Sequence, residues 1–315
     1  MRTLLDRQRT MSLRSLGFAI GVGSLALVAC KTAPNSTLQL DGATALADGG
    51  KKAKPGPVNE LPIPKAEVEA AINRDHLPDY AGPTGVVEGT VYVTGDPAPP
   101  LMGKNFDKCP AAADVYSHTF REGPPRADGS RALPDTILEI IPASGYTDAI
   151  VREKDPNVHA TIANCAYNAR TYVMTFGQAL EVKNEHAGPL FAPYFENQPS
   201  PAVLVATPGG DPVRLYPKNL GRYRMVDRVG NGWLEADVFV IANASHAVSD
   251  VVGHFRIEGV PVGKMKLNAF HPAIEHGFNA DVDVKDGIVT TADVVIPNDK
   301  AAARPASRNL KPLLK

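Results

Sequence analysis

The feature that most constrains the fold is a series of short hydrophobic runs, separated by Gly, Pro and Asn, that extends from residue 85 to residue 296. The first run, Gly85–Val93, alternates in the manner of a strand and ends at the turn sequence Gly95-Asp96-Pro97. Such alternation is typical of strands with one buried face. Strands are expected at 85–93, 136–141, 172–176, 179–184, 236–241, 254–257, 264–267, 280–284 and 291–296. This pattern predicts an all-β protein, built as an antiparallel β-sandwich.

Two long connections, 97–133 and 187–233, interrupt this pattern. Structureless loops of that length are unusual in a compact domain. Each is therefore either a functional loop or a segment whose strands the pattern does not reveal. One helix is expected, at Lys65–Ile72, with Pro64 in its first turn.

The N-terminus combines a basic leader with the uncharged run Ser15–Ala29 and then Cys30. This is the arrangement of a secretory signal. Its end, Leu27-Val28-Ala29-Cys30, resembles the lipobox of bacterial lipoproteins. The resemblance implies that residues 1–29 are a signal peptide and that Cys30 is lipidated. A transmembrane anchor is the alternative, but fifteen uncharged residues fall short of the roughly 20 that a spanning helix needs.

The leader resemblance predicts a cell-envelope protein, attached to the membrane through its lipid and facing the periplasm or the cell surface. Lys31 in place of an aspartate favours the outer membrane. Residues 30–82 are expected to form a flexible tether with the short helix near its end, and 298–315 a disordered tail. The chain has a formal net charge of -1. Without the basic leader it becomes more acidic, which excludes a nucleic-acid partner.

Cys109 and Cys165 are the cysteines that remain after Cys30. An even count in an oxidising compartment favours a disulfide between them. Free or metal-bound thiols stay open as the alternative, although neither cysteine has a CxxC partner or a His at ligand spacing.

Two blocks resemble known modules of secreted bacterial proteins. The stretch from Asn164-Cys165 to Glu185-His186 is similar to the opening of a cupredoxin-like domain, and Phe255–Leu267 with His271-Pro272 resembles a carboxypeptidase regulatory-like β-sandwich. The resemblance implies an N-terminal β segment (83–158), a cupredoxin-like segment (159–235) and a regulatory-like segment (236–297). Whether these form separate domains or one interleaved sheet stays open.

The cupredoxin resemblance fails at the copper chemistry. A type 1 copper site needs a thiolate and two imidazoles. The resemblance places the Cys and the second His in the loop Val229–Leu234, which contains neither, and His186 is the one ligand retained. No cofactor is therefore expected. The rival hypothesis is a histidine-based copper or zinc site, or an electron carrier, assembled from His186, His271 and His276.

Aromatic side chains make the connection 187–233 a candidate contact surface. The aromatic side chains expected to form this surface are Phe191, Tyr194, Phe195 and Trp233. Arginines give the same segment a basic character that could attract an acidic partner: Arg214, Arg222, Arg224 and Arg228. No Gly-x-Ser-x-Gly, His-Glu-x-x-His or P-loop is present, so no enzyme is expected. The sequence thus predicts a non-catalytic binding or assembly module for an envelope protein or glycan, with 187–233 and 270–278 as its contact loops.

Overall fold

The computed structural model describes residues 62–141, 157–200 and 202–299. The predicted signal peptide, the lipidation site Cys30 and the tail beyond residue 299 lie outside these ranges. Helix α1 (Lys65–Ile72) forms where the sequence predicts it. Its Val68 packs against Gly177, where φ is +101° and a Cβ would lie 2.7 Å from the valine side chain. Gly177 therefore serves both a turn and a close helix contact.

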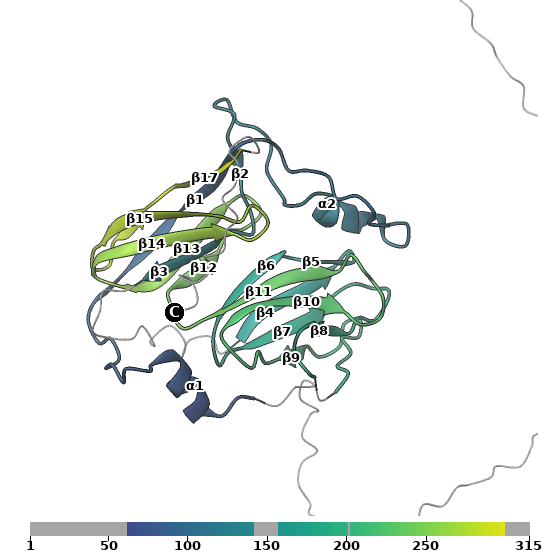
Figure 1. The fold of residues 1–315 in the computed structure, drawn as a ribbon, viewed down its shortest axis with the longest axis horizontal. Helices are drawn as coiled ribbons and strands as arrows, with labels where there is room; N and C mark the ends of the chain where they lie inside the picture. The colour runs from purple at the N-terminus through teal and green to yellow at the C-terminus, as the bar shows by residue number, and fades with distance from the viewer. Residues whose placement is uncertain (1–61, 142–156, 201, 300–315) are drawn as a thin grey trace, which may run out of the picture. The chain divides into compact units, whose positions relative to one another are not determined.

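The first β-sandwich consists of two sheets that pack face to face (Figure 1). In one sheet β1 pairs with β13, β16, β17 and β2; the other has the order β12-β3-β14-β15. The bounds are β1 (Thr84–Gly95), β2 (Arg131–Ala132), β3 (Ile137–Ile141), β12 (His246–Val248), β13 (His254–Pro261), β14 (Gly263–His271), β15 (His276–Val284), β16 (Val289–Thr291) and β17 (Val294–Asn298). The predicted alternation of β1 buries Val87, Val91 and Val93 in this core.

The second β-sandwich is formed by sheets of order β6-β11-β10-β8 and β5-β4-β7-β9. The bounds are β4 (Asn157–Ala163), β5 (Ala166–Tyr167), β6 (Thr171–Thr175), β7 (Ala179–Asn184), β8 (Pro193–Phe195), β9 (Val213–Leu215), β10 (Gly221–Asp227) and β11 (Glu235–Ile241). Met174, Leu180 and Val238 lie in its core. The short helical segments η1 (Pro110–Ala112) and α2 (Ala113–Tyr116) pack Ala112 and Tyr116 against the same core.

The two sandwiches interleave along the chain. Strands β1 to β3 belong to the first, β4 to β11 to the second, and β12 to β17 return to the first. The return is direct: β1 pairs with β13 in antiparallel register from Thr84↔Pro261 to Thr90↔His254. The residues expected as N-terminal and C-terminal segments therefore share sheets, and β11, at the start of the expected C-terminal segment, pairs with β6 and β10.

The prediction of an all-β, antiparallel β-sandwich fold is confirmed, and each predicted strand is present. Four pairings among the described strands are parallel: β1 with β16, β1 with β17, β4 with β7, and β6 with β11. The connection 187–233 contains β8, β9 and β10, and the connection 97–133 contains η1, α2 and β2. Within the described residues, the helices are too short or too polar to cross a membrane.

A third apolar cluster lies between the two sandwiches. It contains Ile137 of β3, Val173 of β6, Phe270 of β14, and Phe239 and Ile241 of β11. The Phe239 and Phe270 rings meet edge to face with centroids 6.0 Å apart. Strands β3 and β11 therefore bury apolar side chains on both faces, which explains their hydrophobic runs.

Candidate binding pocket

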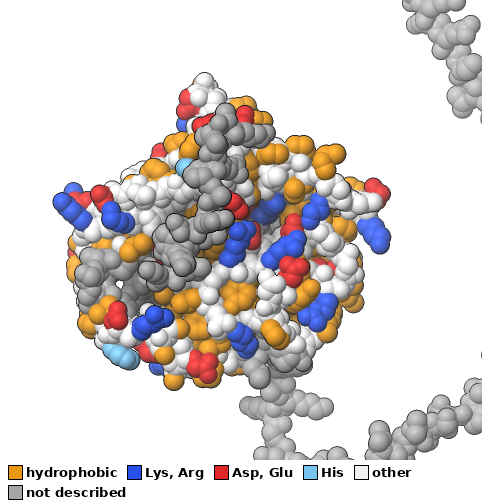
Figure 2. All heavy atoms as spheres, viewed as in Figure 1, with side chains coloured by type: hydrophobic (Ala, Val, Ile, Leu, Met, Phe, Trp, Pro, Cys, Tyr) orange, Lys and Arg blue, Asp and Glu red, His pale blue; other side chains and the backbone are white. Residues whose placement is uncertain are grey.

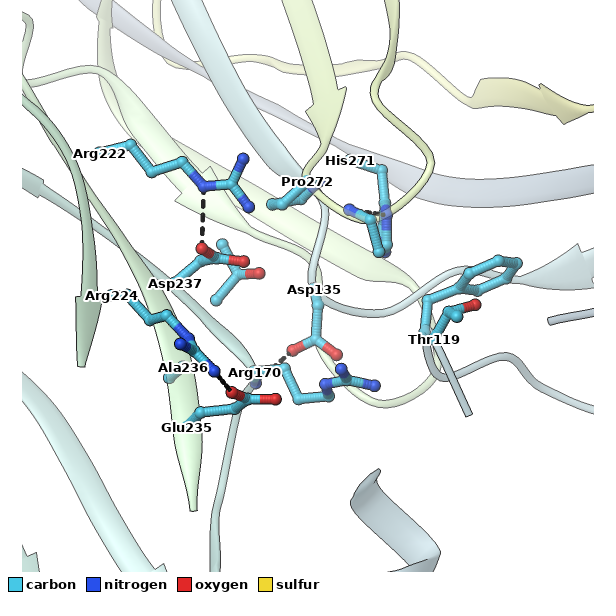
Figure 3. Close-up of a pocket in the computed structure, with 13 residues that line it drawn as sticks. Thr119, Asp135, Arg170, Arg222, Arg224, Glu235, Ala236, Asp237, His271 and Pro272 are labelled. Atoms are coloured by element: carbon cyan, nitrogen blue, oxygen red, sulfur yellow. Dashed lines mark hydrogen bonds and ion pairs between the residues drawn. The ribbon is translucent and has the colours of Figure 1, made fainter. Parts of the chain in front are cut away.

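A pocket of about 220 Å³ lies where the two sandwiches meet. One wall comes from β10 and β11, and the other from residues 119–120, Asp135 and the end of β14. Figure 3 shows the arginine side chains of β10 on one side, with His271 and Pro272 on the other. The lining residues are Thr119, Phe120, Asp135, Arg170, Thr171, Arg222, Arg224, Glu235, Ala236, Asp237, His271, Pro272 and Ala273.

Asp135 is fixed at the base of this pocket by two arginines. Its Oδ1 accepts hydrogen bonds from Arg121 Nη2 at 2.6 Å and from the backbone N–H of Arg170 at 2.7 Å, and its Oδ2 accepts one from Arg121 Nε at 2.7 Å. The Arg170 side chain extends past the Tyr116 ring and donates to the carbonyl of His118 at 2.8 Å. The carboxylate is thus fully engaged by groups of the protein.

Two further ion pairs cross from β10 to β11. Arg222 Nε donates to Asp237 Oδ1 at 2.8 Å, and Arg224 pairs with Glu235 (Figure 3). Lys104 adds a second cation to Glu235, at 2.9 Å. Burial pushes the pKa of Glu235 upward, but the hydrogen bonds from Lys104 and Arg224 outweigh it and hold the pKa below its usual value. Glu235 is therefore ionised at neutral pH.

Arg222 differs from the other basic side chains of the pocket. Its guanidinium lies 5.4 Å from the Phe239 ring centroid and uses Nε for Asp237, while its two Nη atoms have no hydrogen-bond partner among the described residues. Its side chain is 37% exposed. Arg222 therefore presents the open end of a planar, charged donor pair to the pocket.

His271 is a buried member of the lining rather than an open ligand. Its Nδ1 accepts hydrogen bonds from the backbone N–H groups of Ala273 and Ile274, both at 3.3 Å, which places its hydrogen on Nε2. Nε2 is buried and has no hydrogen-bond partner among the described residues. Burial lowers the pKa of His271 to about 4, so the ring is neutral at pH 7.

The predicted three-histidine metal site is not assembled in the described part of the chain. His271 and His276 face each other across the β14–β15 hairpin, but His186 joins a different group. The side chains that could share an ion there are Cys109, Cys165 and His186, whose ligand atoms lie within 4.8 Å of one another. Sequence spacing could not reveal this group, because its members come from segments 56 and 21 residues apart.

The favoured disulfide between Cys109 and Cys165 is present, with a Cα–Cα distance of 6.2 Å. Cys165 lies in a two-residue turn between β4 and β5, where Asn164 has φ +50° and Cys165 φ +58°. Two positive φ values are what a type I′ hairpin turn requires. With both of these sulfurs in a disulfide and one imidazole beside them, the residues do not fit the type 1 copper site of the family that the sequence resembles.

The aromatic contact surface expected from the sequence is wrong for three of its four residues. Phe191, Phe195 and Trp233 are 0%, 3% and 7% exposed and pack in the second core. The half-buried Tyr194 lies under the guanidinium of Arg228, 4.2 Å from its ring centroid. These side chains hold the connection 187–233 to its own sandwich. A buried ring offers no area to a partner, so they do not form a contact surface.

The four arginines predicted to form a basic loop lie mostly on strands. Arg214 of β9 pairs with Glu181, Arg222 and Arg224 of β10 pair with β11, and Arg228 follows β10. On the face shown in Figure 2, basic and acidic side chains are interspersed. Ion pairs therefore compensate Arg214, Arg222 and Arg224, although Arg222 keeps both Nη atoms open, while Arg228 lies over the Tyr194 ring with no ion pair among the described residues.

No protein-family model and no curated protein matches this chain. Among solved structures, it is similar to the Cu-containing nitrite reductase from Thermus scotoductus SA-01, with 13% identity and a TM-score of 0.23 over 27% of this chain and 22% of that chain. A heme-copper terminal oxidase dimer is similar at 11% identity and a TM-score of 0.22, over 28% of this chain and 67% of that chain. The chain thus spans about a fifth of the nitrite reductase. Likenesses this weak assign neither a function nor a copper site.

Proposed function

We propose that this protein is a non-catalytic binding protein that takes a carboxylate group of its ligand against Arg222, in the pocket between the two sandwiches. The observation that carries this proposal is an imbalance of hydrogen-bonding capacity. Asp135, Glu235 and Asp237 are each engaged by a cation, while the Nη atoms of Arg222 have no partner among the described residues. The lining therefore offers the two Nη donors of Arg222, while Asp135 and Glu235 use both carboxylate oxygens within the protein and Asp237 uses its Oδ1 for Arg222 Nε.

Arginine suits this role because its planar fork matches the two oxygens of a carboxylate and forms two parallel charge-assisted hydrogen bonds. Phe239 below the guanidinium and Asp237 at Nε limit its rotation, so little conformational freedom is lost when a ligand binds. The volume of about 220 Å³ suits one acidic side chain or a small dicarboxylate.

Among the described residues that line the pocket, no acid–base group is available, and this supports the non-catalytic part of the proposal. Each lining carboxylate is ion-paired, and His271 is buried with a pKa of about 4. General acid–base catalysis works best with a group whose pKa lies near the working pH and that can reach the substrate. Attachment to the cell envelope through Cys30, which lies outside the described residues, belongs to the same proposal; an acidic segment of an envelope protein is then the natural ligand.

Calorimetric titration of the full chain tests this function. The probes are a capped tetraglutamate peptide, glutarate, and a capped tetraglutamine peptide of the same length. Tetraglutamate is expected to bind and tetraglutamine not; binding of glutarate as tightly as the peptide would identify a small-molecule ligand rather than a protein segment. Arg222→Gln should weaken binding by about 10- to 100-fold, the equivalent of about 1.5–3 kcal/mol for a charged hydrogen-bonded contact.

Arg256→Gln is the matched control. Arg256 lies on β13, is ion-paired with Glu88 and Glu258, and does not line the pocket. Both substitutions remove one partly exposed, ion-paired arginine and the same charge. Equal loss of tetraglutamate binding in both variants, or unchanged binding in Arg222→Gln, would contradict the proposed site.

A further inference from the structure

A second cluster, none of whose residues lines the pocket, joins two sulfurs and an imidazole. Cys109 precedes η1, Cys165 lies in the β4–β5 turn, and His186 follows β7. His186 Nε2 lies 3.3 Å from Cys165 Sγ, and the three ligand atoms lie within 4.8 Å of one another. Both cysteines are buried, while His186 is half-buried. The imidazole is therefore the most exposed of the three groups.

The surroundings hold these groups in place. The indole Nε1–H of Trp233 donates to the carbonyl of Cys165 at 3.1 Å, and the backbone N–H of His186 donates to Asn184 Oδ1 at 3.0 Å. Gly188 lies against the same imidazole: a Cβ there would be 3.0 Å from Nε2 and 3.2 Å from Cδ2. A larger residue at position 188 would thus displace the nitrogen that faces the sulfur.

We propose that the reduced form of this cluster binds one Cu(I) ion through the sulfurs of Cys109 and Cys165 and Nε2 of His186, and that the disulfide is its metal-free form. Two thiolates are soft donors that favour Cu(I), and imidazole is a nitrogen ligand that copper also accepts. A structural zinc site takes four protein ligands, whereas this cluster supplies three. The site is independent of the carboxylate pocket, because none of its residues lines that pocket.

The geometry allows the disulfide form to change into the Cu(I)-bound form with small movements. Metal–sulfur bonds of about 2.3 Å place two thiolates of one ion roughly 4 Å apart. The Cα atoms of Cys109 and Cys165 are 6.2 Å apart, so rotation about the Cα–Cβ bonds can separate the sulfurs once the S–S bond is broken. His186 Nε2 is already 3.3 Å from one sulfur, close to the separation of two ligand atoms on one ion.

The redox step requires a dithiol reductant. One thiolate of the reductant attacks a sulfur of the disulfide and forms a mixed disulfide, with the other protein sulfur leaving as a thiolate. The second thiol of the reductant then displaces the remaining protein sulfur, so the reductant becomes a disulfide and the protein gains two electrons and two protons. Cu(I) binding replaces those two thiol protons, which are released to solvent.

Anaerobic Cu(I) titration of the full chain, in competition with bicinchoninate, tests this proposal. The chain is first reduced with a phosphine, which takes up oxygen from water to become the phosphine oxide and is then removed. We expect one Cu(I) per reduced chain and none per oxidised chain. X-ray absorption should show two sulfur neighbours and one nitrogen. His186→Ala should lose the nitrogen neighbour and weaken Cu(I) binding by more than about tenfold, since even an outer-shell partner contributes about that much.

His276→Ala is the control, because His276 is exposed on β15 and lies outside the cluster. It should bind Cu(I) as the unsubstituted chain does. His186→Ala keeps both cysteines, so quantitative return of its disulfide on oxidation shows that the site still folds. No Cu(I) retained by the reduced chain, an unchanged affinity and coordination shell in His186→Ala, or retention of Zn(II) at these donors against Cu(I) would each overturn the proposal.

Discussion

Arg121 and Asp135 form a bidentate ion pair with N···O distances of 2.7 and 2.6 Å, and their side chains are only 15% and 4% exposed. Burial pulls the pKa of Arg121 down, but the hydrogen bond and charge of Asp135 outweigh it and raise the pKa above its usual value. Asp135 also accepts a hydrogen bond from the backbone N–H of Arg170, which directly precedes β6 of the second sandwich. The carboxylate of Asp135 thus connects three parts of the chain: the loop that contains Arg121, the residues just before β3 and the residue just before β6.

Asp135→Asn should destabilise the protein by about 3 kcal/mol, because removing one partner leaves the other charge buried and unpaired. Asn is the appropriate substitution, since Asp135 has φ +64° and Asn tolerates this conformation about as well as Asp. The measurement is the free energy of unfolding from urea titration. Disruption of the exposed Arg256 pairs in Arg256→Gln should change it by no more than about 0.5 kcal/mol. Similar losses of unfolding free energy in the two variants would show that the buried Arg121–Asp135 pair stabilises the protein no more than the exposed pairs of Arg256.

Trp233→Phe should cost about 1–3 kcal/mol of stability, since the indole donates to the buried carbonyl of Cys165 and phenylalanine cannot. The same urea titration measures it. Tyr194→Phe, which removes a polar group from a half-buried aromatic of the same connection, should stay within about 0.5 kcal/mol. If Trp233→Phe were as mild as Tyr194→Phe, the hydrogen bond to Cys165 would contribute little to the fold.

Trp233 also belongs to the part of the chain whose strands the hydrophobic pattern did not reveal. Period-two alternation located the long strands, such as β1, because their buried and exposed positions differ in hydrophobicity. It missed β8 and β9, which have three residues each, and β10, whose outward arginines disguise the pattern. Without those strands the aromatics of 187–233 looked exposed, whereas the strands place Phe191, Phe195 and Trp233 in the core.

The candidate pocket was only partly predictable. The segments 187–233 and 270–278 contribute Arg222, Arg224 and His271 to its lining, while their role as contact loops stays a prediction. Asp135 and Arg170 had no sequence signal, because each sits alone between strands and gains its partner only when the two sandwiches interleave. The approach of His186 to Cys165 was hidden for the same reason: tertiary pairing of separate turns sets it, not spacing along the chain.

Opening the Cys109–Cys165 disulfide should lower the free energy of unfolding by about 4 kcal/mol, since the bridge spans a sequence separation of 56 residues and limits the unfolded chain. Urea titrations of the full chain with and without a phosphine reductant measure the loss. The double substitution of Cys109→Ala with Cys165→Ala should be destabilised in both conditions and should not respond to the reductant. A phosphine effect that persists in the double variant would have to arise elsewhere in the chain.

Acidification should destabilise the protein through His271. Its pKa is about 4 in the folded protein and 6.5 in the unfolded chain, so the unfolded state binds the proton more readily. The stability is therefore fully present above pH 6.5 and is lost as the pH falls toward 4, by about 3 kcal/mol in total. His271→Gln removes this titration, so the difference in unfolding free energy between the unsubstituted chain and the variant should shrink across that window. Carboxylates titrate equally in both proteins and cancel from the difference.

His276→Gln, at an exposed position, should instead follow the unsubstituted chain at every pH. Parallel pH curves for the unsubstituted chain and His271→Gln would show that the buried imidazole is not what acid acts on.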